Sequence, residues 1–199
     1  MSLAEPGRRR MAVRILTFAA VMAALSVILK VIPSIQLGST QRISFRIVPI
    51  MLCSMYCGPG VGMLTALVAD ITGFFVQTMS STFLPGFTLT ELLRGLLPGL
   101  IVYCFGRRVN KWSVLVVTVV DFVCLALLLQ SFWLGVIYPR GGAAVGWSGY
   151  WAMLLTRLPG SALTAAANLF GLSVLTPVMN RLLPADFLPV ERAGKPDRA

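Results

Sequence analysis

Six charged side chains lie within or beside long apolar segments, and their types could do chemistry there. They are Arg46, Asp70, Glu91, Arg94, Asp121 and Arg157. A charged residue near the centre of a membrane-spanning helix costs roughly 2.5–3.5 kcal/mol on insertion scales, so such residues usually serve a function. Arginine presents a planar fork that binds carboxylates through paired hydrogen bonds and stacks on flat rings. The set therefore favours binding of an anionic, flat, polar ligand.

Catalysis is disfavoured by the residue types that the chain lacks. It has no histidine, which removes imidazole metal ligands and histidine general bases. Its four cysteines form no CxxC pair and fall in or beside apolar segments, which favours buried free thiols. There is no phosphate-binding loop for ATP. We therefore expect a protein that is not an enzyme and uses no cofactor or metal. An intramembrane enzyme with a cysteine nucleophile is a weaker alternative, since no base is visible.

The composition indicates where these charges must reside. Of 199 residues, 57% are hydrophobic and 12% charged, against roughly 45–50% and about 25% in soluble domains. A globule of this size cannot hide that excess, which excludes an ordinary soluble enzyme, a disordered chain and a typical nucleic-acid-binding domain. The net charge of +10 comes from basic residues at segment ends and in tails, which indicates contact with a membrane surface and no nucleic-acid partner.

The apolar segments predict an all-α membrane protein with six transmembrane helices. A helix needs roughly 20 mainly apolar residues to cross a membrane. The expected spans are about 11–36, 44–57, 61–78, 88–105, 112–138 and 147–183. Pro159 and Pro177 predict a bend or break in the last span. The six-helix domain thus covers 11–183, between a basic N-terminal segment, 1–10, and a polar tail, 184–199.

Loop charges predict the orientation. If the N-terminus is inside, the basic residues of the N-terminal segment, of the loop 106–111 and of the tail are all inside, whereas the outer loops hold only Arg42 and Arg140. This asymmetry follows the positive-inside rule. Both termini should be cytoplasmic, in a multi-pass protein of the plasma membrane.

With this topology, several polar and aromatic side chains from five helices fall in the outer half of the membrane. They are Arg46, Asp70, Arg94, Gln130, Trp133 and Arg157. Small and polar stripes at helical spacing pass through Asp70 in the third span and Arg157 in the sixth, and such stripes face neighbours or a cavity rather than lipid. The pattern predicts an outward-facing pocket.

Structural roles for the same charges are the alternative. Glu91 and Arg94 are three residues apart and could pair on one helix. Asp70 could pair with Arg157 or Arg46, and Arg46 and Lys30 could extend to the outer interface. Asp121 has no obvious partner in the sequence.

Several motifs resemble a known family. The run Arg42-Ile43-Ser44-Phe45, then Pro49, Gly58-Pro59, Gly62 and Ala69-Asp70, resembles the substrate-binding S components of energy-coupling factor (ECF) vitamin transporters over about residues 11–180. The run 83–90, Phe-Leu-Pro-Gly-Phe-Thr-Leu-Thr, is most similar to the folate-family members. The pairs Ala19/Ala23 and Ala20/Ala24 are similar to the Ala-xxx-Ala motif of the family.

The resemblance implies six helices and an outward pocket, capped by the loop between the first two helices, that captures folate or a related vitamin. It also implies a membrane T subunit and two cytoplasmic ATPases as partners, with the whole S component toppling in the membrane to release substrate. Ala19, Ala20, Ala23 and Ala24 would form the docking face for the T subunit, although internal packing is the alternative for such small-residue pairs.

The resemblance also implies a set of pocket residues. They are Arg42, Arg46, Asp70, Phe83, Phe87, Arg94, Gln130, Trp133 and Arg157. Asp70 would accept hydrogen bonds from a pterin, and Arg42, Arg46 or Arg157 would meet the glutamate carboxylates. The competing hypothesis is a small membrane scaffold or assembly protein that binds no small molecule and whose intramembrane charges are structural pairs.

Overall fold

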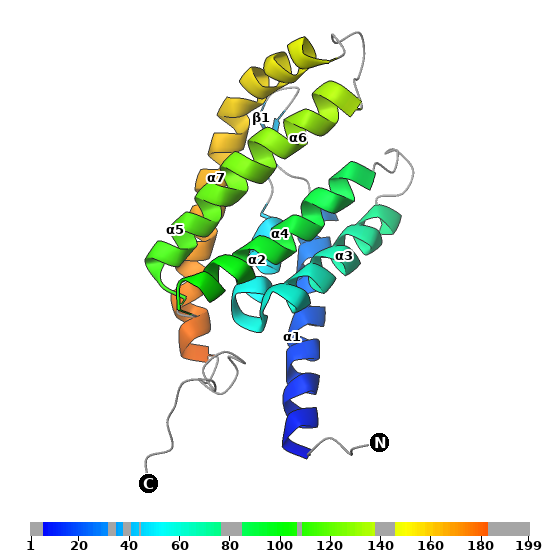
Figure 1. The fold of residues 1–199 in the computed structure, drawn as a ribbon. Helices are drawn as coiled ribbons and strands as arrows, with labels where there is room; N and C mark the ends of the chain where they lie inside the picture. Colours follow the sequence, from blue (N-terminus) through cyan, green and yellow to red (C-terminus); the bar gives the residue numbers. More distant parts are fainter. Residues whose placement is uncertain are drawn as a thin grey trace.

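The structure, a computed structural model, describes residues 6–31, 35–37, 41–43, 45–76, 85–106, 109–137 and 146–182. The chain begins with α1 (Pro6–Val31), a hairpin of β1 (Ile35–Leu37) and β2 (Gln41–Ile43), α2 (Ile47–Cys57), α3 (Pro59–Val76) and α4 (Pro85–Cys104). It continues through α5 (Lys111–Val120), η1 (Asp121–Leu129), α6 (Gln130–Phe132) and η2 (Trp133–Ile137), which follow one another without a break, and ends with α7 (Trp147–Leu182). Figure 1 shows these elements as a bundle in which the start of α1 and the end of α7 lie at the same end.

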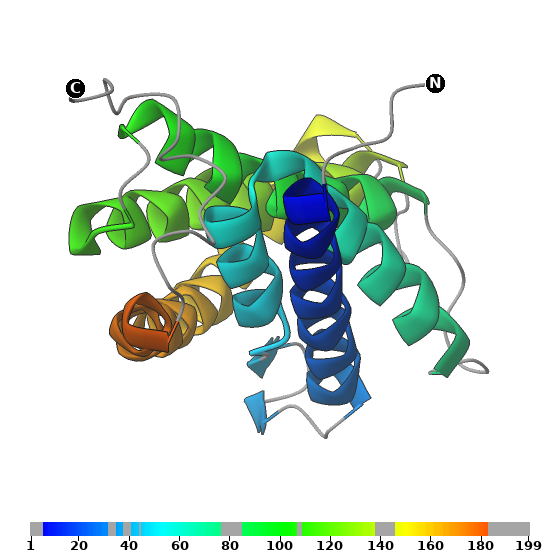
Figure 2. The ribbon, with the colours of Figure 1, turned by 90° about the horizontal axis from the view of Figure 1, so that it is seen from below.

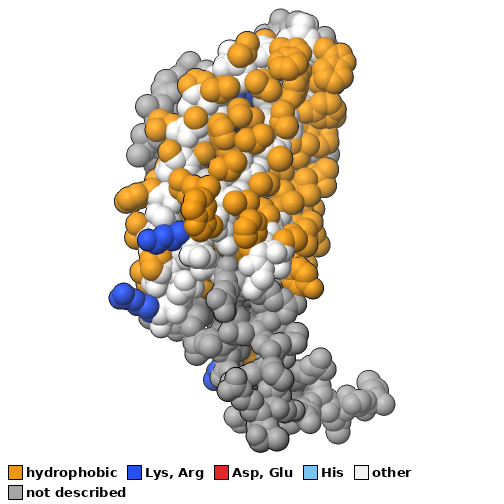
Figure 3. All heavy atoms as spheres, turned by 60° about the vertical axis from the view of Figure 1, so that its left-hand side comes forward, with side chains coloured by type: hydrophobic (Ala, Val, Ile, Leu, Met, Phe, Trp, Pro, Cys, Tyr) orange, Lys and Arg blue, Asp and Glu red, His pale blue; other side chains and the backbone are white. Residues whose placement is uncertain are grey.

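Five helical stretches are long and apolar enough to cross a membrane, which confirms the predicted all-α membrane fold. They are Met11–Lys30, Pro59–Val76, Gly86–Cys104, Lys111–Ile137 and Trp147–Arg181. The predicted second span is instead α2, which has 11 residues and is shorter than the roughly 20 that a crossing needs. Figure 3 shows one face that is hydrophobic over most of its height, with Lys and Arg side chains mainly near its lower end, as a lipid-facing surface requires.

The short helix α2 is the centre of the bundle, and every one of its residues is buried. Figure 2 shows it between α1 and α7. Met51, Leu52 and Tyr56 pack with residues of α4, α5 and α7, among them Val117 and Leu172. The Tyr56 hydroxyl donates to Asn180 Oδ1 at 2.7 Å, and its oxygen lies 3.1 Å from the Thr176 carbonyl oxygen. The surrounding helices thus bury α2, which is too short to span the bilayer, and hold it in place.

The predicted first span, about 11–36, was too long. The helix ends at Val31, and Gln36 lies in β1, paired with Arg42 of β2 in an antiparallel hairpin. Pro33 follows the helix end closely, and a proline disfavours helical backbone at the residue before it. The last span does not break at its prolines, because α7 continues through Pro159 and Pro177 for 36 residues; the alternative of a bend stays a prediction.

Glycines set the distance between α3 and α4. A Cβ atom on Gly95 would lie 2.7 Å from the carbonyl carbon of Gly62 and 2.8 Å from the Ala66 Cβ, both on α3. A Cβ on Gly99 would lie 2.6 Å from the Pro59 nitrogen. Since neither backbone can withdraw cheaply from such contacts, these small residues serve internal packing.

We expect Gly95→Ala to separate α3 from α4 and to destabilise the protein by about 1–3 kcal/mol, the usual cost of overfilling a packed interior. Thermal unfolding in detergent would measure the loss. Gly60→Ala is the matched control, because nothing lies within 4 Å of a Cβ at that position. Equal stability of the two variants would contradict the close packing described here.

Candidate functional site

Four of the intramembrane charges form one buried ionic chain, which consists of Arg46, Glu91, Arg94 and Asp121. Glu91 Oε1 accepts from Arg46 Nη2 at 2.5 Å and from Arg94 Nη1 at 2.8 Å, and Arg94 Nε donates to Asp121 Oδ1 at 3.0 Å. The side chains of Glu91 and Arg94 are 3% and 4% exposed. Two arginines and two carboxylates leave the chain formally neutral, which lowers the cost of burying it.

The buried ionic chain joins three elements that are distant in sequence. Arg46 precedes α2, Glu91 and Arg94 lie on α4, and Asp121 begins η1. The predicted pairing of Glu91 with Arg94 is confirmed, and Asp121, for which the sequence suggested no partner, is the counter-ion of Arg94. On the main chain, Ser26 of α1 donates to the Arg46 carbonyl at 2.8 Å. Arg46 is therefore held at both its backbone and its side chain.

A second polar cluster consists of Lys30, Asp70 and Thr88, on α1, α3 and α4. Lys30 Nζ lies 3.3 Å from Asp70 Oδ1, and Thr88 Oγ1 donates to Asp70 Oδ2 at 3.0 Å. One alternative was therefore wrong: Asp70 pairs with neither Arg46 nor Arg157, and its cationic partner is Lys30. Gly73 leaves the space for this, because a Cβ there would lie 2.6 Å from the Lys30 Cδ.

Arg157 and Gln130 form a separate pair. Arg157 Nη2 on α7 donates to Gln130 Oε1 on α6 at 2.9 Å. The Arg157 carbonyl accepts from Ser161 Oγ at 2.8 Å, one turn further along α7. The sequence placed both side chains in the outer half of the membrane, and the structure joins them directly. This pair contains a cation but no carboxylate.

Aromatic and backbone groups meet where α4 begins. The indole of Trp133, on η2, lies against Gly86, whose missing side chain makes room for it, since a Cβ there would overlap the ring. Phe132 contacts Trp133 edge to face, with ring centroids 5.8 Å apart. Phe87 is half-buried and follows Gly86 directly. The start of α4 thus meets η2, at the C-terminal end of the helical stretch Lys111–Ile137, through Gly86.

Two predicted pocket residues have positions that the structure does not describe in full. Phe83 lies outside the described residues. Arg42 is in β2, opposite Gln36, but its side chain is outside the described part. The predictions for both remain predictions.

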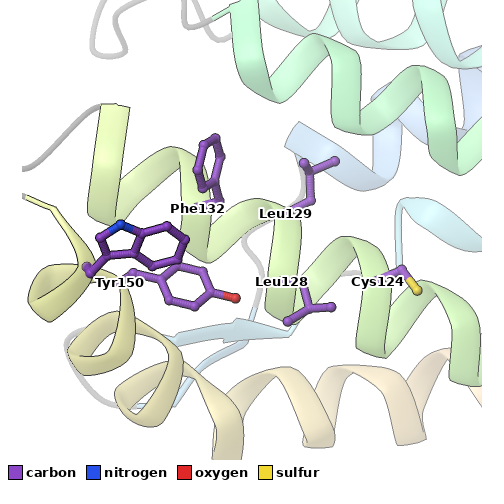
Figure 4. A pocket seen from close by; sticks show the side chains of 6 residues that line it. Cys124, Leu128, Leu129, Phe132 and Tyr150 are labelled. Carbon is purple, nitrogen blue, oxygen red and sulfur yellow. The ribbon is translucent and has the colours of Figure 1, made fainter.

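A pocket of about 320 Å³, which the sequence did not predict, opens between α7 and the helical stretch Lys111–Ile137 (Figure 4). Its lining is apolar or aromatic, from Cys124, Leu128, Leu129, Phe132, Trp147 and Tyr150. In Figure 4, Tyr150 reaches from α7 toward the helix that carries Leu128 and Phe132. The four-residue spacing of Cys124, Leu128 and Phe132 was the available signal. The pocket suits an apolar group and offers no charge to an ionic ligand.

The alanine pairs of α1 lie on two different faces. Ala19 and Ala23 are buried, the first beside Cys53 and Cys57 of α2 and the second beside Ile50. Ala20 and Ala24 are exposed. Internal packing therefore accounts for one pair, and only the other is accessible to a partner helix. Docking through this motif remains a prediction.

Comparison with known proteins gives one family. The sequence profile described as "ECF transporter, substrate-specific component" matches residues 14–179. No curated protein matches the chain significantly.

We expect Asp121→Leu to destabilise the protein by about 3–5 kcal/mol, because it leaves Arg94 and Arg46 to share the single charge of Glu91 in a buried place. Denaturation in detergent would measure this. The double variant Arg94→Leu/Asp121→Leu removes one pair of opposite charges and should recover most of the loss. A single variant as stable as the wild type would show that Asp121 does not compensate Arg94.

Proposed function

We propose that this chain, which belongs to the family of substrate-specific components of ECF transporters, captures folate or a closely related vitamin outside the cell and delivers it inward. Membership of the family makes the chain a transporter subunit rather than an enzyme, one that binds a small molecule and associates with a T subunit and ATPase subunits. The identity of the vitamin, the plasma-membrane location and the residues that bind the substrate belong to the proposal.

The contact between Gly86 and Trp133 is the observation that carries the folate proposal. It places Gly86, which belongs to the part of the sequence most similar to folate-family members, against the indole of Trp133 on η2. A pterin is flat and needs such a surface for stacking, which is worth about 0.5–1.5 kcal/mol beyond the area it buries. Phe87, next along α4, would be a second wall of this outer-end site.

The ion pairs of the bundle refine the expected roles of the charged candidates. Arg46 and Arg94 share Glu91, and Asp70 binds Lys30. These contacts favour a structural role for the three residues, as the scaffold hypothesis supposed for all the intramembrane charges. The family match over residues 14–179 excludes a scaffold without ligand as the main function, so the structural pairs are best understood as the frame of a binding site.

We expect the purified chain in detergent to bind folate or a reduced folate with nanomolar affinity when tryptophan fluorescence is followed during titration. Riboflavin, thiamine and pantothenate serve as competitors. Trp133→Leu should weaken binding by about two- to tenfold through loss of the stacking surface. Trp112→Leu is the control, because Trp112 is 71% exposed at the opposite end of the same span. Absence of folate binding by a folded sample would overturn the folate proposal.

We also expect Ala20→Leu/Ala24→Leu to impair assembly with the T subunit while leaving vitamin binding intact, because these two positions are exposed on α1. Co-purification of the tagged chain with the T and ATPase subunits, together with uptake in cells, would measure this. Ala19→Leu/Ala23→Leu is the contrasting variant, and it should instead destabilise the chain by overfilling the contact with α2. Normal assembly and uptake by the first variant would place the docking face elsewhere.

A further inference from the structure

Among the described residues, four basic ones are buried or half-buried, namely Lys30, Arg46, Arg94 and Arg157, and they differ in how their charge is neutralised. Lys30, Arg46 and Arg94 each lie within hydrogen-bond distance of a carboxylate. Arg157 instead binds the neutral amide of Gln130. Within the part of the chain that the structure describes, no carboxylate lies within ion-pair distance of Arg157.

The depth of Arg157 makes this difference costly. It follows Trp147, the first residue of α7, by ten positions, which is about 15 Å along a helix axis. An isolated charge at such depth costs roughly 2.5–3.5 kcal/mol on insertion scales. With the predicted orientation Arg157 lies well inside the outer interface, and its side chain is directed to Gln130.

The surroundings of Arg157 do not compensate its charge. Gln130 offers the guanidinium a neutral amide dipole and no charge. The Ser161 hydroxyl donates to the Arg157 carbonyl and not to a group that would neutralise the guanidinium. Arg94 acts on Arg157 with a like charge, and the two carboxylates near Arg94 are already engaged with arginines. The positive charge of Arg157 is therefore uncompensated at the contact between α6 and α7, whereas the buried ionic chain is neutral.

We infer that Arg157, oriented by Gln130, binds an anionic group of the transported ligand, most simply a carboxylate. A guanidinium has five N–H donors, and the bond to Gln130 uses one, so a bidentate carboxylate contact is available. The Gln130 amide nitrogen can donate to the same anion. This inference rests on the proposed function and deepens it, because it assigns the contact with a carboxylate of the ligand to Arg157, whose partner is a neutral amide, rather than to Arg46, which is paired with Glu91.

The test compares a ligand that has free carboxylates with its uncharged ester. The full chain in detergent is titrated with folate and with folate dimethyl ester, and the ratio of the two affinities is the readout. We expect the wild type to prefer folate by about ten- to hundredfold, the usual range for a hydrogen-bonded charge. Arg157→Gln should remove this preference and leave the affinity for the ester nearly unchanged, which a merely structural role of Arg157 would not do.

Matched variants keep the result interpretable. Arg181→Gln makes the same change on α7 at its other, exposed end and should retain the preference. Arg157→Lys keeps the charge without the fork and should retain part of it, and Gln130→Leu provides a second test if Arg157→Gln does not fold. A folded Arg157→Gln variant that still prefers folate overturns the inference.

The outcomes for the wild type separate the two proposals. If the wild type binds a cationic or neutral vitamin most tightly, the anion site is wrong while the transporter role stands. If it binds a different carboxylate vitamin, the same ratio between that vitamin and its ester decides the role of Arg157. If a folded sample binds no vitamin at all, both proposals fail.

Discussion

The bundle depends on the neutralisation of charged side chains in its interior, where Glu91 and Arg94 are buried. Glu91 is the centre of this arrangement, since one of its oxygens accepts from two arginines that come from different elements. Removing water from a charged group costs several kcal/mol, and only close partners offset that cost. The elements that carry the buried ionic chain are therefore obliged to meet at one point. α2 must begin beside α4, and η1 must lie against α4 so that Asp121 reaches Arg94.

The central position of α2 follows from the same constraint. It begins directly after Arg46, whose carbonyl is bound by α1 and whose side chain is bound by α4. From that fixed point the helix runs through the middle of the bundle with all its residues buried. The longer helices around it then supply the apolar surface that meets lipid. Charge pairing fixes the entry of the helix, and apolar packing holds the rest.

The sequence predicted much of this architecture and less of the site. Apolar run lengths located the helices to within a few residues, because the bilayer imposes a minimum length on each span. The pairing of Glu91 with Arg94 followed from their spacing on one helix. The partners of Asp70 and Asp121 did not, because they come from other helices, and which helices are neighbours is decided by packing. The hairpin and the pocket beside Tyr150 were missed for a related reason: both depend on contacts between segments rather than on a periodic pattern.

The two alanine faces of α1 bear on how such a chain would change over generations. Ala19 and Ala23 contribute to the interior of their own protein, so any lineage that keeps the fold must keep them small. Ala20 and Ala24 are exposed, and on the proposed docking a partner helix would select for their small size. If a descendant lost its partner, substitutions would accumulate at the second pair and not at the first. Sequence variation at Ala19 and Ala23 would then reflect the requirements of the fold, and variation at Ala20 and Ala24 would reflect those of the association.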